Sequence, residues 1–297
     1  MATIIRGING QRAYPEIVHK VVTFGRVRSP RGLATRDLGL TIIELERPWH
    51  ALPLGCGRDL NKNIAAAEAV QLIGGFTNPT LLTKAAPGKF EPFMDEGTFH
   101  GSYGRRIGYQ VLNVINKLQH DPQTRQAVIT LWDPVLDNRP DQHDYPCTVA
   151  LHFAIEDDNE LVMTTYMRSN DVWLGLPYDL FQFTQLQLSM AYTLDVGCGR
   201  YTHIAQSLHI YETDVEAAKK LHTPPTNFEM QPLGIGNYSM SFTEIMKRAR
   251  RLTIAYADKL KEETESEHWY RDRFASYLGS DVDGDGTNHL KTVTLLP

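Results

Sequence analysis

Residues 147–194 constrain the fold most strongly, because two strand-like runs are followed there by a long apolar run. Apolar side chains occupy alternate positions of CTVALHFAI, namely Val149, Leu151, Phe153 and Ile155. A period of two is typical of a strand with one buried face. EDDNE then predicts a turn and LVMTTYMRS a returning strand, so we expect a hairpin. The next run, LPYDLFQFTQLQLSMAYTL, is apolar on nearly every side and predicts a buried helix.

The rest of the chain mixes helices and strands without the regular rhythm of a βαβ protein. LGLTIIEL, RQAVITLW and SLHIY are typical of strands. NIAAAEAVQLIGG, ended by the Gly74-Gly75 pair, and GYQVLNVINKL have helical spacing. The mixture predicts the α+β class. We expect one domain over 1–261 and a polar appendage of unknown role over 262–297.

Two capping boxes predict further helix starts. Thr213 with Glu216 follows the strand-like SLHIY and predicts a short helix. Ser241 with Glu244 predicts a longer one. In both pairs a hydroxyl residue precedes a glutamate by three positions, so each side chain can hydrogen-bond to the backbone N–H at the other's position.

Charge and composition narrow the function classes. The net charge of −5 and the pI of about 6.1 argue against a general nucleic-acid binder. No apolar run approaches the roughly 20 residues that cross a bilayer, and the first residues lack the apolar core of a signal peptide. Three widely spaced cysteines, Cys56, Cys147 and Cys198, form neither a disulfide framework nor a CxxC metal pair. We therefore expect a cytoplasmic protein with reduced thiols and no metal.

Cys147 is the first candidate for chemistry. Taken alone, a cysteine at the start of a strand is more often a small core residue than a nucleophile. Arg168 changes this balance, because it ends the returning strand. If the hairpin turns at 157–159, the two residues lie opposite each other. A guanidinium beside a thiol lowers the thiol pKa and makes the thiolate available.

The segments PCTVALHF, YMRSNDVWLGLPYDLFQF and SLHIY, in this order and spacing, resemble the thymidylate synthase superfamily. The core of the resemblance runs from about Thr124 to Tyr211. It implies a mixed β-sheet with packed helices, a homodimer formed sheet to sheet, and a catalytic role for the domain over 1–261. In that family a cysteine attacks C6 of a pyrimidine nucleotide. C5 of the base then takes a one-carbon unit from 5,10-methylenetetrahydrofolate, the co-substrate.

The resemblance also implies roles for residues around the nucleotide. Cys147 matches the nucleophile, and Tyr103, in HGSYGRR, matches a tyrosine near it. Arg168 and Ser169 match phosphate contacts, with Arg168 also close to the thiolate. Arg31, in SPRGLATRD, matches a further phosphate-binding arginine near the N-terminus.

Four other positions match the sugar and folate sides of the family's site. His209 and Tyr211 match the pair that binds the sugar 3′-hydroxyl. Asp171 matches the aspartate that holds the folate pterin. Glu68 matches a helix glutamate that organises proton transfers through water and adjoins the folate. Outside this context an exposed helix residue is the commoner reading of a glutamate such as Glu68.

Asp179 departs from the synthases, which carry an asparagine at the matching position. That asparagine donates to O4 of uracil and accepts from N3–H, whereas an ionised carboxylate only accepts. Facing cytosine, Asp179 can accept from the 4-amino group, and a proton shared with N3 completes the pair. Thr148 also differs, because synthases usually have histidine after the cysteine. Both departures resemble the phage-type deoxycytidylate hydroxymethylases, in which water adds to the exocyclic methylene.

A third departure concerns the phosphate. The family donates an arginine pair across the dimer interface, and here Arg125 is followed by Gln126. We expect Arg125 to act across the interface, with phosphate binding weakened or rearranged by the missing guanidinium. This change leaves the choice between dCMP and CMP open.

Three functions stay open at this point. The first is a folate-dependent hydroxymethyltransferase that converts dCMP or CMP, methylenetetrahydrofolate and water to 5-hydroxymethyl-(d)CMP and tetrahydrofolate. The second is a thymidylate synthase that methylates dUMP and releases dihydrofolate. The third is a catalytically silent relative that binds nucleotides or RNA. DVDGDG, near the C-terminus, imitates a calcium loop, but Thr292 stands where such a loop needs glutamate.

Overall fold

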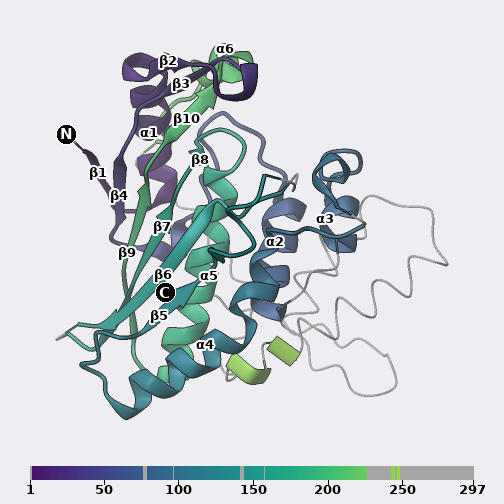
Figure 1. The fold of residues 1–297 in the computed structure, drawn as a ribbon. Coiled ribbons are helices and arrows are strands. Elements are labelled where there is room, and N and C mark those ends of the chain that lie inside the picture. The colour runs from purple at the N-terminus through teal and green to yellow at the C-terminus, as the bar shows by residue number, and fades with distance from the viewer. Residues whose placement is uncertain are drawn as a thin grey trace, which may run out of the picture.

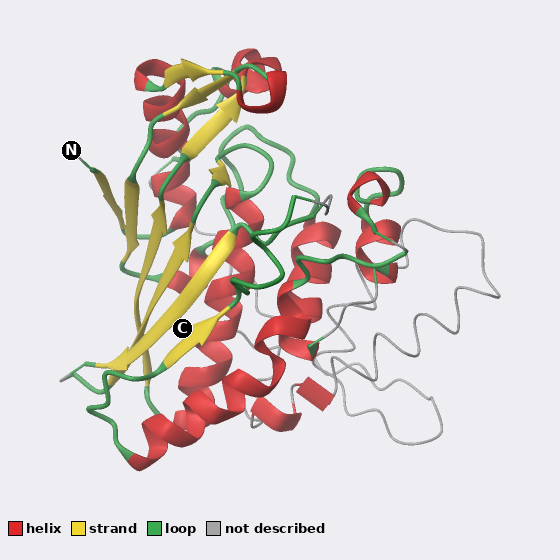
Figure 2. Ribbon diagram, in the orientation of Figure 1, coloured by secondary structure: helices red, strands yellow, loops and turns green. Residues whose placement is uncertain are grey.

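The computed structural model describes residues 2–75, 79–95, 97–140, 144–156, 158–225, 242–244 and 246–247. Ser241 of the second capping box, the DVDGDG segment and the proposed appendage over 262–297 lie outside these residues. Strands and helices are mixed, as the sequence predicts (Figures 1 and 2). None of the helices in the described ranges is both long and apolar enough to span a membrane.

Six strands form the main sheet, in the order β1-β4-β9-β7-β6-β5, and four short strands form a second sheet, in the order β2-β3-β10-β8. The strands are β1 (Thr3–Gly7), β2 (Arg26–Arg28), β3 (Thr35–Asp37), β4 (Thr41–Leu45), β5 (Val128–Thr130), β6 (Thr148–Ile155), β7 (Glu160–Met167), β8 (Asn170–Asp171), β9 (Gly197–Ala205) and β10 (Leu208–Tyr211). The pairs β1–β4, β7–β9 and β8–β10 are parallel, so the predicted mixed sheet is confirmed.

The helices pack on one face of the main sheet (Figure 1). They are α1 (Gly10–Phe24), α2 (Lys62–Gly74), α3 (Thr80–Ala85), α4 (Tyr103–His120), α5 (Leu176–Leu194) and α6 (Val215–Ala218). Short 3-10 turns lie at η1 (Pro30–Gly32), η2 (Pro48–His50), η3 (Glu91–Phe93) and η4 (Glu212–Asp214). The opposite face of the sheet carries partly exposed apolar side chains, including Ile4, Val128 and Tyr166.

The central hairpin is confirmed. β6 pairs antiparallel with β7, and Thr148 lies opposite Met167. The predicted alternation holds for Leu151 and Phe153, which are fully buried, but not for Val149, because the register shifts between Thr148 and Ala150. The carbonyl of Val149 accepts the backbone N–H groups of both Leu131 and Trp132, as in a β-bulge. The shift leaves Thr148, instead of Val149, on the buried face.

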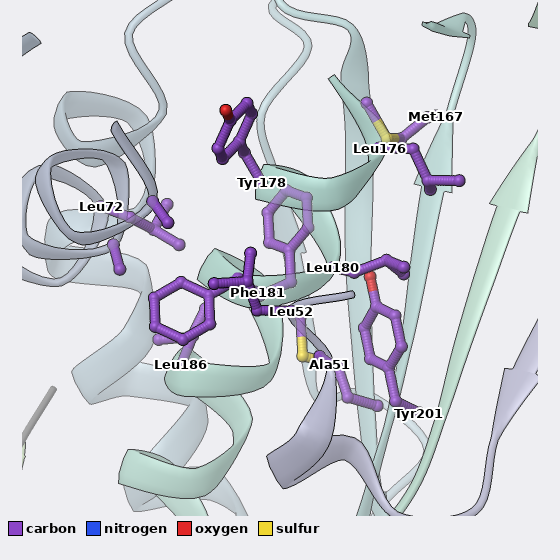
Figure 3. Packing of buried hydrophobic residues seen from close by; sticks show 14 of the residues in the cluster. Ala51, Leu52, Leu72, Met167, Leu176, Tyr178, Leu180, Phe181, Leu186 and Tyr201 are labelled. Carbon is purple, nitrogen blue, oxygen red and sulfur yellow. The ribbon is translucent and has the colours of Figure 1, made fainter. Parts of the chain in front are cut away.

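The predicted buried helix is α5, whose first half is buried at nearly every position. Figure 3 shows Leu176 and Leu180 of α5 in the same apolar cluster as Met167 of β7 and Tyr201 of β9. α2 packs beside α5 and ends at Gly75, which has a φ of 73°. This left-handed conformation suits glycine and confirms the predicted helix stop. The helix predicted from GYQVLNVINKL is α4.

Two expectations about helices were incomplete or wrong. No pattern in the sequence predicts α1, because a proline, Pro15, lies inside the helix. The short helix predicted after SLHIY is confirmed as α6, but the Thr213–Glu216 capping box that predicts its start does not form. The helix starts later, at Val215, without a side-chain cap. The carboxylate of Glu216 accepts a hydrogen bond from Nζ of Lys219 at 2.6 Å and not from the backbone N–H at Thr213.

Candidate functional site

Cys147 and Arg168 lie side by side at the end of the central hairpin. The backbone N–H of Arg168 donates to the carbonyl of Cys147 at 2.9 Å, which continues the β6–β7 ladder by one rung. Nη2 of Arg168 is 3.8 Å from the Cys147 sulfur. The sequence prediction that the hairpin would place these residues opposite each other is therefore confirmed.

The guanidinium of Arg168 also fixes the segment that enters β6. Nε donates to the carbonyl of Pro146 at 3.0 Å, and Nη2 donates to the carbonyl of Tyr145 at 3.2 Å. The group lies over the ring of Trp132, 5.6 Å from its centroid. Since a guanidinium carries five N–H donors, donors remain for a ligand beside the thiol.

Burial dominates the electrostatics of the thiol. It raises the pKa of Cys147 above its usual value, and the nearby charges of Asp179 and Asp144 act in the same direction. The charges of Arg168 and Arg31 lower the pKa but do not outweigh burial. The expectation that Arg168 would leave the thiol with a depressed pKa is therefore wrong for the free protein. The group is a neutral thiol until something further favours its anion.

Tyr103 stands close to Cys147, at the start of α4. Its hydroxyl oxygen accepts the backbone N–H of Thr148 at 3.2 Å, and its ring stacks on Phe183 of α5 at 5.9 Å between centroids. Burial raises the pKa of the phenol well above its usual value, and the charge of Cys147 adds to this. Tyr103 therefore keeps its proton and can donate it to a hydrogen bond near the thiol.

Asp179 occupies the first turn of α5 and is only 7% exposed. Its Oδ2 accepts a hydrogen bond from Nδ2 of Asn170 at 2.7 Å, and its Oδ1 accepts one from Nε2 of Gln182 at 3.0 Å. The same Nε2 lies 3.5 Å from Oε2 of Glu68, on α2. Gln182 thus joins two carboxyl groups that come from different helices.

Both carboxyl groups hold protons more tightly than usual. Burial raises the pKa of Asp179 to about 7, against the effect of its two amide donors. Burial also raises the pKa of Glu68 to about 8, and the negative charge of Asp179 adds to this. Groups that titrate near neutral pH are suited to proton transfer, and such shifts often mark functional sites.

A buried polar chain continues from Asn170 into the sheet. Its Oδ1 lies 3.2 Å from Nε2 of His203, whose Nδ1 lies 2.9 Å from the hydroxyl of Tyr201. That hydroxyl is 3.0 Å from Oγ1 of Thr165. Burial lowers the pKa of His203 to about 3, so the ring is neutral at physiological pH.

Asp171 of β8 and His209 of β10 lie beside each other on neighbouring parallel strands of the second sheet. Oδ1 of Asp171 accepts the backbone N–H groups of Trp173 and Leu174 at 2.7 and 2.9 Å. Its Oδ2 is buried and, like Nδ1 of His209, has no partner among the described residues. The ring of Tyr211 lies edge-on to His209, with 5.7 Å between centroids. Two unpaired buried polar atoms, one from each strand, are available to a ligand.

The other expected phosphate ligands are less enclosed. Arg31 is exposed on the turn η1, with a φ of 54°, and its charge acts on Cys147. Ser169 is half-buried and directly follows Arg168. Arg125 is exposed in the segment that enters β5, the edge strand of the main sheet. The fold of one chain therefore brings Cys147 and Asp179 close enough for their charges to interact, but leaves Arg125 at its border.

Sequence reasoning missed three residues of this site, namely Asn170, Gln182 and His203. Gln182 follows Asp179 by three positions on one helix, which places both on the same face. That spacing is a signal the sequence already contained. His203 looks like one of eleven scattered histidines until β9 is aligned beside β7. Within the described ranges, no group of three or more His, Cys, Asp or Glu side chains is placed to hold a metal ion.

Comparison with known proteins identifies the class of protein. The family model for thymidylate synthase matches residues 12–246. The chain therefore belongs to the thymidylate synthase family. Its mixed sheet with packed helices is the architecture that the sequence resemblance predicts.

Two phage proteins stand among its relatives, and both bear the name deoxyuridylate hydroxymethyltransferase. The one from Bacillus phage SP01 is 30% identical over 229 residues, which are 71% of this chain and 59% of the relative. The one from Pseudomonas phage M6 is 27% identical over 218 residues, 70% of this chain and 62% of the relative. This chain thus spans about three fifths of the length of these relatives. Thymidylate synthase of Clostridium beijerinckii is 33% identical over 132 residues, 43% of this chain and 49% of that protein.

Proposed function

We propose that the protein is a folate-dependent C5 hydroxymethyltransferase of pyrimidine nucleotides, with dCMP ahead of CMP as its substrate. One nucleotide, one methylenetetrahydrofolate and one water give the 5-hydroxymethyl nucleotide and tetrahydrofolate, so no hydride moves and no dihydrofolate forms. The observation that carries the base assignment is the buried carboxyl of Asp179, whose oxygens both accept amide hydrogens.

Cys147 is the proposed nucleophile. Its thiolate adds to C6 of the base, which makes C5 able to attack a one-carbon electrophile. The thiol pKa is raised in the free protein. A bound nucleotide on the remaining Arg168 donors would fix that guanidinium beside the sulfur. The sulfur leaves C6 again when the product is complete, so the enzyme is regenerated.

Glu68 and Asp179 are the proposed proton-transfer and base-reading groups. The pKa values of about 8 and about 7 let each carboxyl hold or release a proton near neutral pH. Asp179 can accept from the 4-amino group of cytosine while a proton is shared with N3. With uracil, an ionised carboxylate oxygen would instead face O4, so that two acceptors oppose each other. A buried site discriminates strongly against such an unpaired contact.

The folate would supply the one-carbon unit, and Asp171 is the residue proposed to hold it. Oδ1 of Asp171 is used by two backbone N–H groups, whereas Oδ2 is buried without a partner among the described residues. A pterin ring presents N–H donors that fit such an acceptor. The unpaired Nδ1 of His209, with Tyr211 beside it, is proposed to hold the sugar hydroxyl.

Addition of water, in place of hydride transfer, is favoured by two observations. The two phage relatives are named as hydroxymethyltransferases. In addition, the hydroxyl of Thr148, next to the nucleophile, is buried and has no hydrogen-bond partner within the described part of the chain. An unpaired hydroxyl on the residue after the proposed nucleophile can accept a hydrogen bond from the added water or donate one to it.

A second candidate is the same hydroxymethyl transfer to dUMP. It is favoured by the names of both phage relatives, which specify deoxyuridylate. It is also compatible with a protonated Asp179, since a neutral carboxyl offers one donor and one acceptor, as the synthase asparagine does.

The test is a mass-spectrometric assay with methylenetetrahydrofolate and dCMP, CMP or dUMP supplied separately. A gain of CH2O on a cytidylate without dihydrofolate absorbance is the expected result, and it also identifies the sugar. A gain of CH2O on dUMP alone supports the second candidate. A gain of CH2 with dihydrofolate formation would refute hydroxymethyl transfer altogether.

We also propose that the enzyme is a homodimer that pairs the uncovered faces of the main sheet. That face carries partly exposed Ile4, Val128 and Tyr166, and Arg125 stands at its β5 border, where it can reach a partner's site. Mixing inactive Cys147→Ala with inactive Arg125→Ala chains should restore roughly a quarter of the parent activity, because half the random dimers are mixed and each has one intact site. No recovery after subunit exchange would contradict a shared site.

A further inference from the structure

The two oxygens of Asp179 are not equivalent. Oδ2 accepts a short hydrogen bond of 2.7 Å from Asn170. Oδ1 accepts a longer one of 3.0 Å from Gln182, whose Nε2 also lies 3.5 Å from Glu68. Within a neutral carboxyl, the carbonyl oxygen accepts hydrogen bonds better than the hydroxyl oxygen does. The stronger and dedicated donor on Oδ2 therefore favours Oδ2 as the carbonyl and Oδ1 as the site of the proton.

The Asn170 amide lies with its nitrogen toward Asp179 and its oxygen toward His203. An amide oxygen only accepts, so Nε2 of His203, at 3.2 Å, carries a hydrogen and donates it to Oδ1 of Asn170. Nδ1 of this neutral ring then carries no hydrogen and can accept the single hydroxyl hydrogen of Tyr201, 2.9 Å away, in place of Oγ1 of Thr165. Turning the amide over would place its oxygen against Asp179 and its N–H against His203. The amide oxygen would then oppose an ionised Asp179, and pairing its N–H with His203 would require the other ring tautomer, at a place where His203 is fully buried and Asn170 is 3% exposed.

The position of this proton has a consequence for the base. Cytosine donates from its 4-amino group and accepts at N3, whereas uracil accepts at O4 and donates from N3. A neutral carboxyl can pair with either one, but with its proton on opposite oxygens. The oxygen that holds the proton, more than the presence of a carboxyl, therefore separates the two bases.

We propose that Asn170 is a specificity-determining positioning residue. It holds Oδ2 of Asp179 as an acceptor, under the control of His203 and Tyr201, and so confines the shared proton to Oδ1. For cytosine, Oδ2 then faces the 4-amino group. The inference rests on the proposed function, because it requires a pyrimidine that Asp179 reads.

Two matched variants test it, since each removes one amide donor from Asp179. The measurement is the ratio of the dissociation constants of dCMP and dUMP, obtained by titration calorimetry. Asn170→Ala removes the bias on Oδ2, so the ratio should move toward one by about tenfold or more. Gln182→Ala removes the donor from Oδ1, which strengthens the bias, so the ratio should be kept or enlarged. A merely structural role of both amides would lower discrimination equally in the two variants.

A second pair keeps the test decisive if Asn170→Ala does not fold. His203→Phe removes the N–H that orients Asn170 and should also move the ratio toward one, whereas His203→Gln retains an N–H donor and should keep it. The inference is overturned if the ratio is unchanged in Asn170→Ala and His203→Phe, or if it falls as far in Gln182→Ala.

The parent protein separates this inference from the proposed function. A parent that prefers dUMP overturns the inference, because an acceptor held on Oδ2 would then face O4 of uracil. A parent that forms no 5-hydroxymethyl nucleotide refutes the proposed function alone, and the binding ratios of the variants still test the inference. A parent that binds both nucleotides equally overturns the inference itself, because no proton is then confined. Thermal melting of each variant with and without dCMP confirms that the measured ratios come from folded protein.

Discussion

Replacing Glu68 by glutamine should change how the stability of the protein depends on pH. Burial raises the pKa of Glu68 from 4.5 to about 8. A raised pKa means that the folded state binds the proton more tightly than the unfolded state. The stabilisation is therefore complete below about pH 4.5 and is lost as the pH rises through about 8.

The size of the effect follows from the shift. At about 1.4 kcal/mol per pKa unit, the change from 4.5 to about 8 corresponds to roughly 5 kcal/mol as an upper bound. Relaxation around the charged group and entry of water reduce this, so we expect about 2–4 kcal/mol. Glutamine stays neutral at every pH. The parent should thus lose this much stability relative to Glu68→Gln between about pH 5 and about pH 9.

Urea unfolding of both proteins across this range measures the difference directly. Glu46→Gln is the matched control, because Glu46 is exposed on the surface, and the same change there should leave the pH dependence as in the parent. If the free energies of unfolding of the parent and of Glu68→Gln differ by the same amount at every pH, the reasoning is refuted. Such a result would mean that the carboxyl is as well solvated in the folded protein as in the unfolded chain.

Three further variants probe the rest of the site. Cys147→Ala should abolish turnover while calorimetry still detects nucleotide binding, and measurable turnover would disprove the nucleophile. Arg168→Lys should lower turnover by about tenfold or more, because an ammonium cannot serve the carbonyls of the entering segment and the sulfur together, and unchanged kinetics would argue against that role. Gly175→Ala places a Cβ 3.2 Å from both Nδ2 of Asn170 and Oδ2 of Asp179. The crowding should lengthen that hydrogen bond and reduce discrimination between dCMP and dUMP in competition assays.

Local patterns predicted the elements whose signals lie within one segment. The hairpin, α5, α2 and α4 follow from periodicity and from the glycine stop at Gly75. The position of Val149 could not be predicted, because the register shift that displaces it arises only when β6 pairs with β7. α1 was missed because Pro15 argues against a helix interior unless tertiary packing compensates.

The site shows the same division. The placement of Cys147 opposite Arg168 follows from counting residues from the turn. The raised thiol pKa does not, because it depends on how many other segments cover the sulfur. Similarly, the sequence shows that Asp179 is an unusual carboxylate. It does not show both of the amide side chains that donate to it, because these come from different elements of the fold. Gln182 lies on the same helix, whereas Asn170 depends on the register of the second sheet and on β9, which supplies His203.

The backbone hydrogen bond from Arg168 to the carbonyl of Cys147 joins these two residues to the β6–β7 ladder in the interior of the main sheet. β7 lies between β6 and β9 in the interior of the main sheet, and Met167, the preceding residue, is 1% exposed. Amide hydrogens in such a position exchange with solvent only when the whole domain opens. Hydrogen exchange at Arg168 should therefore be as slow as in the most protected core strands. The spacing between sulfur and guanidinium would then persist through local fluctuations of the surrounding loops and fail only on global unfolding.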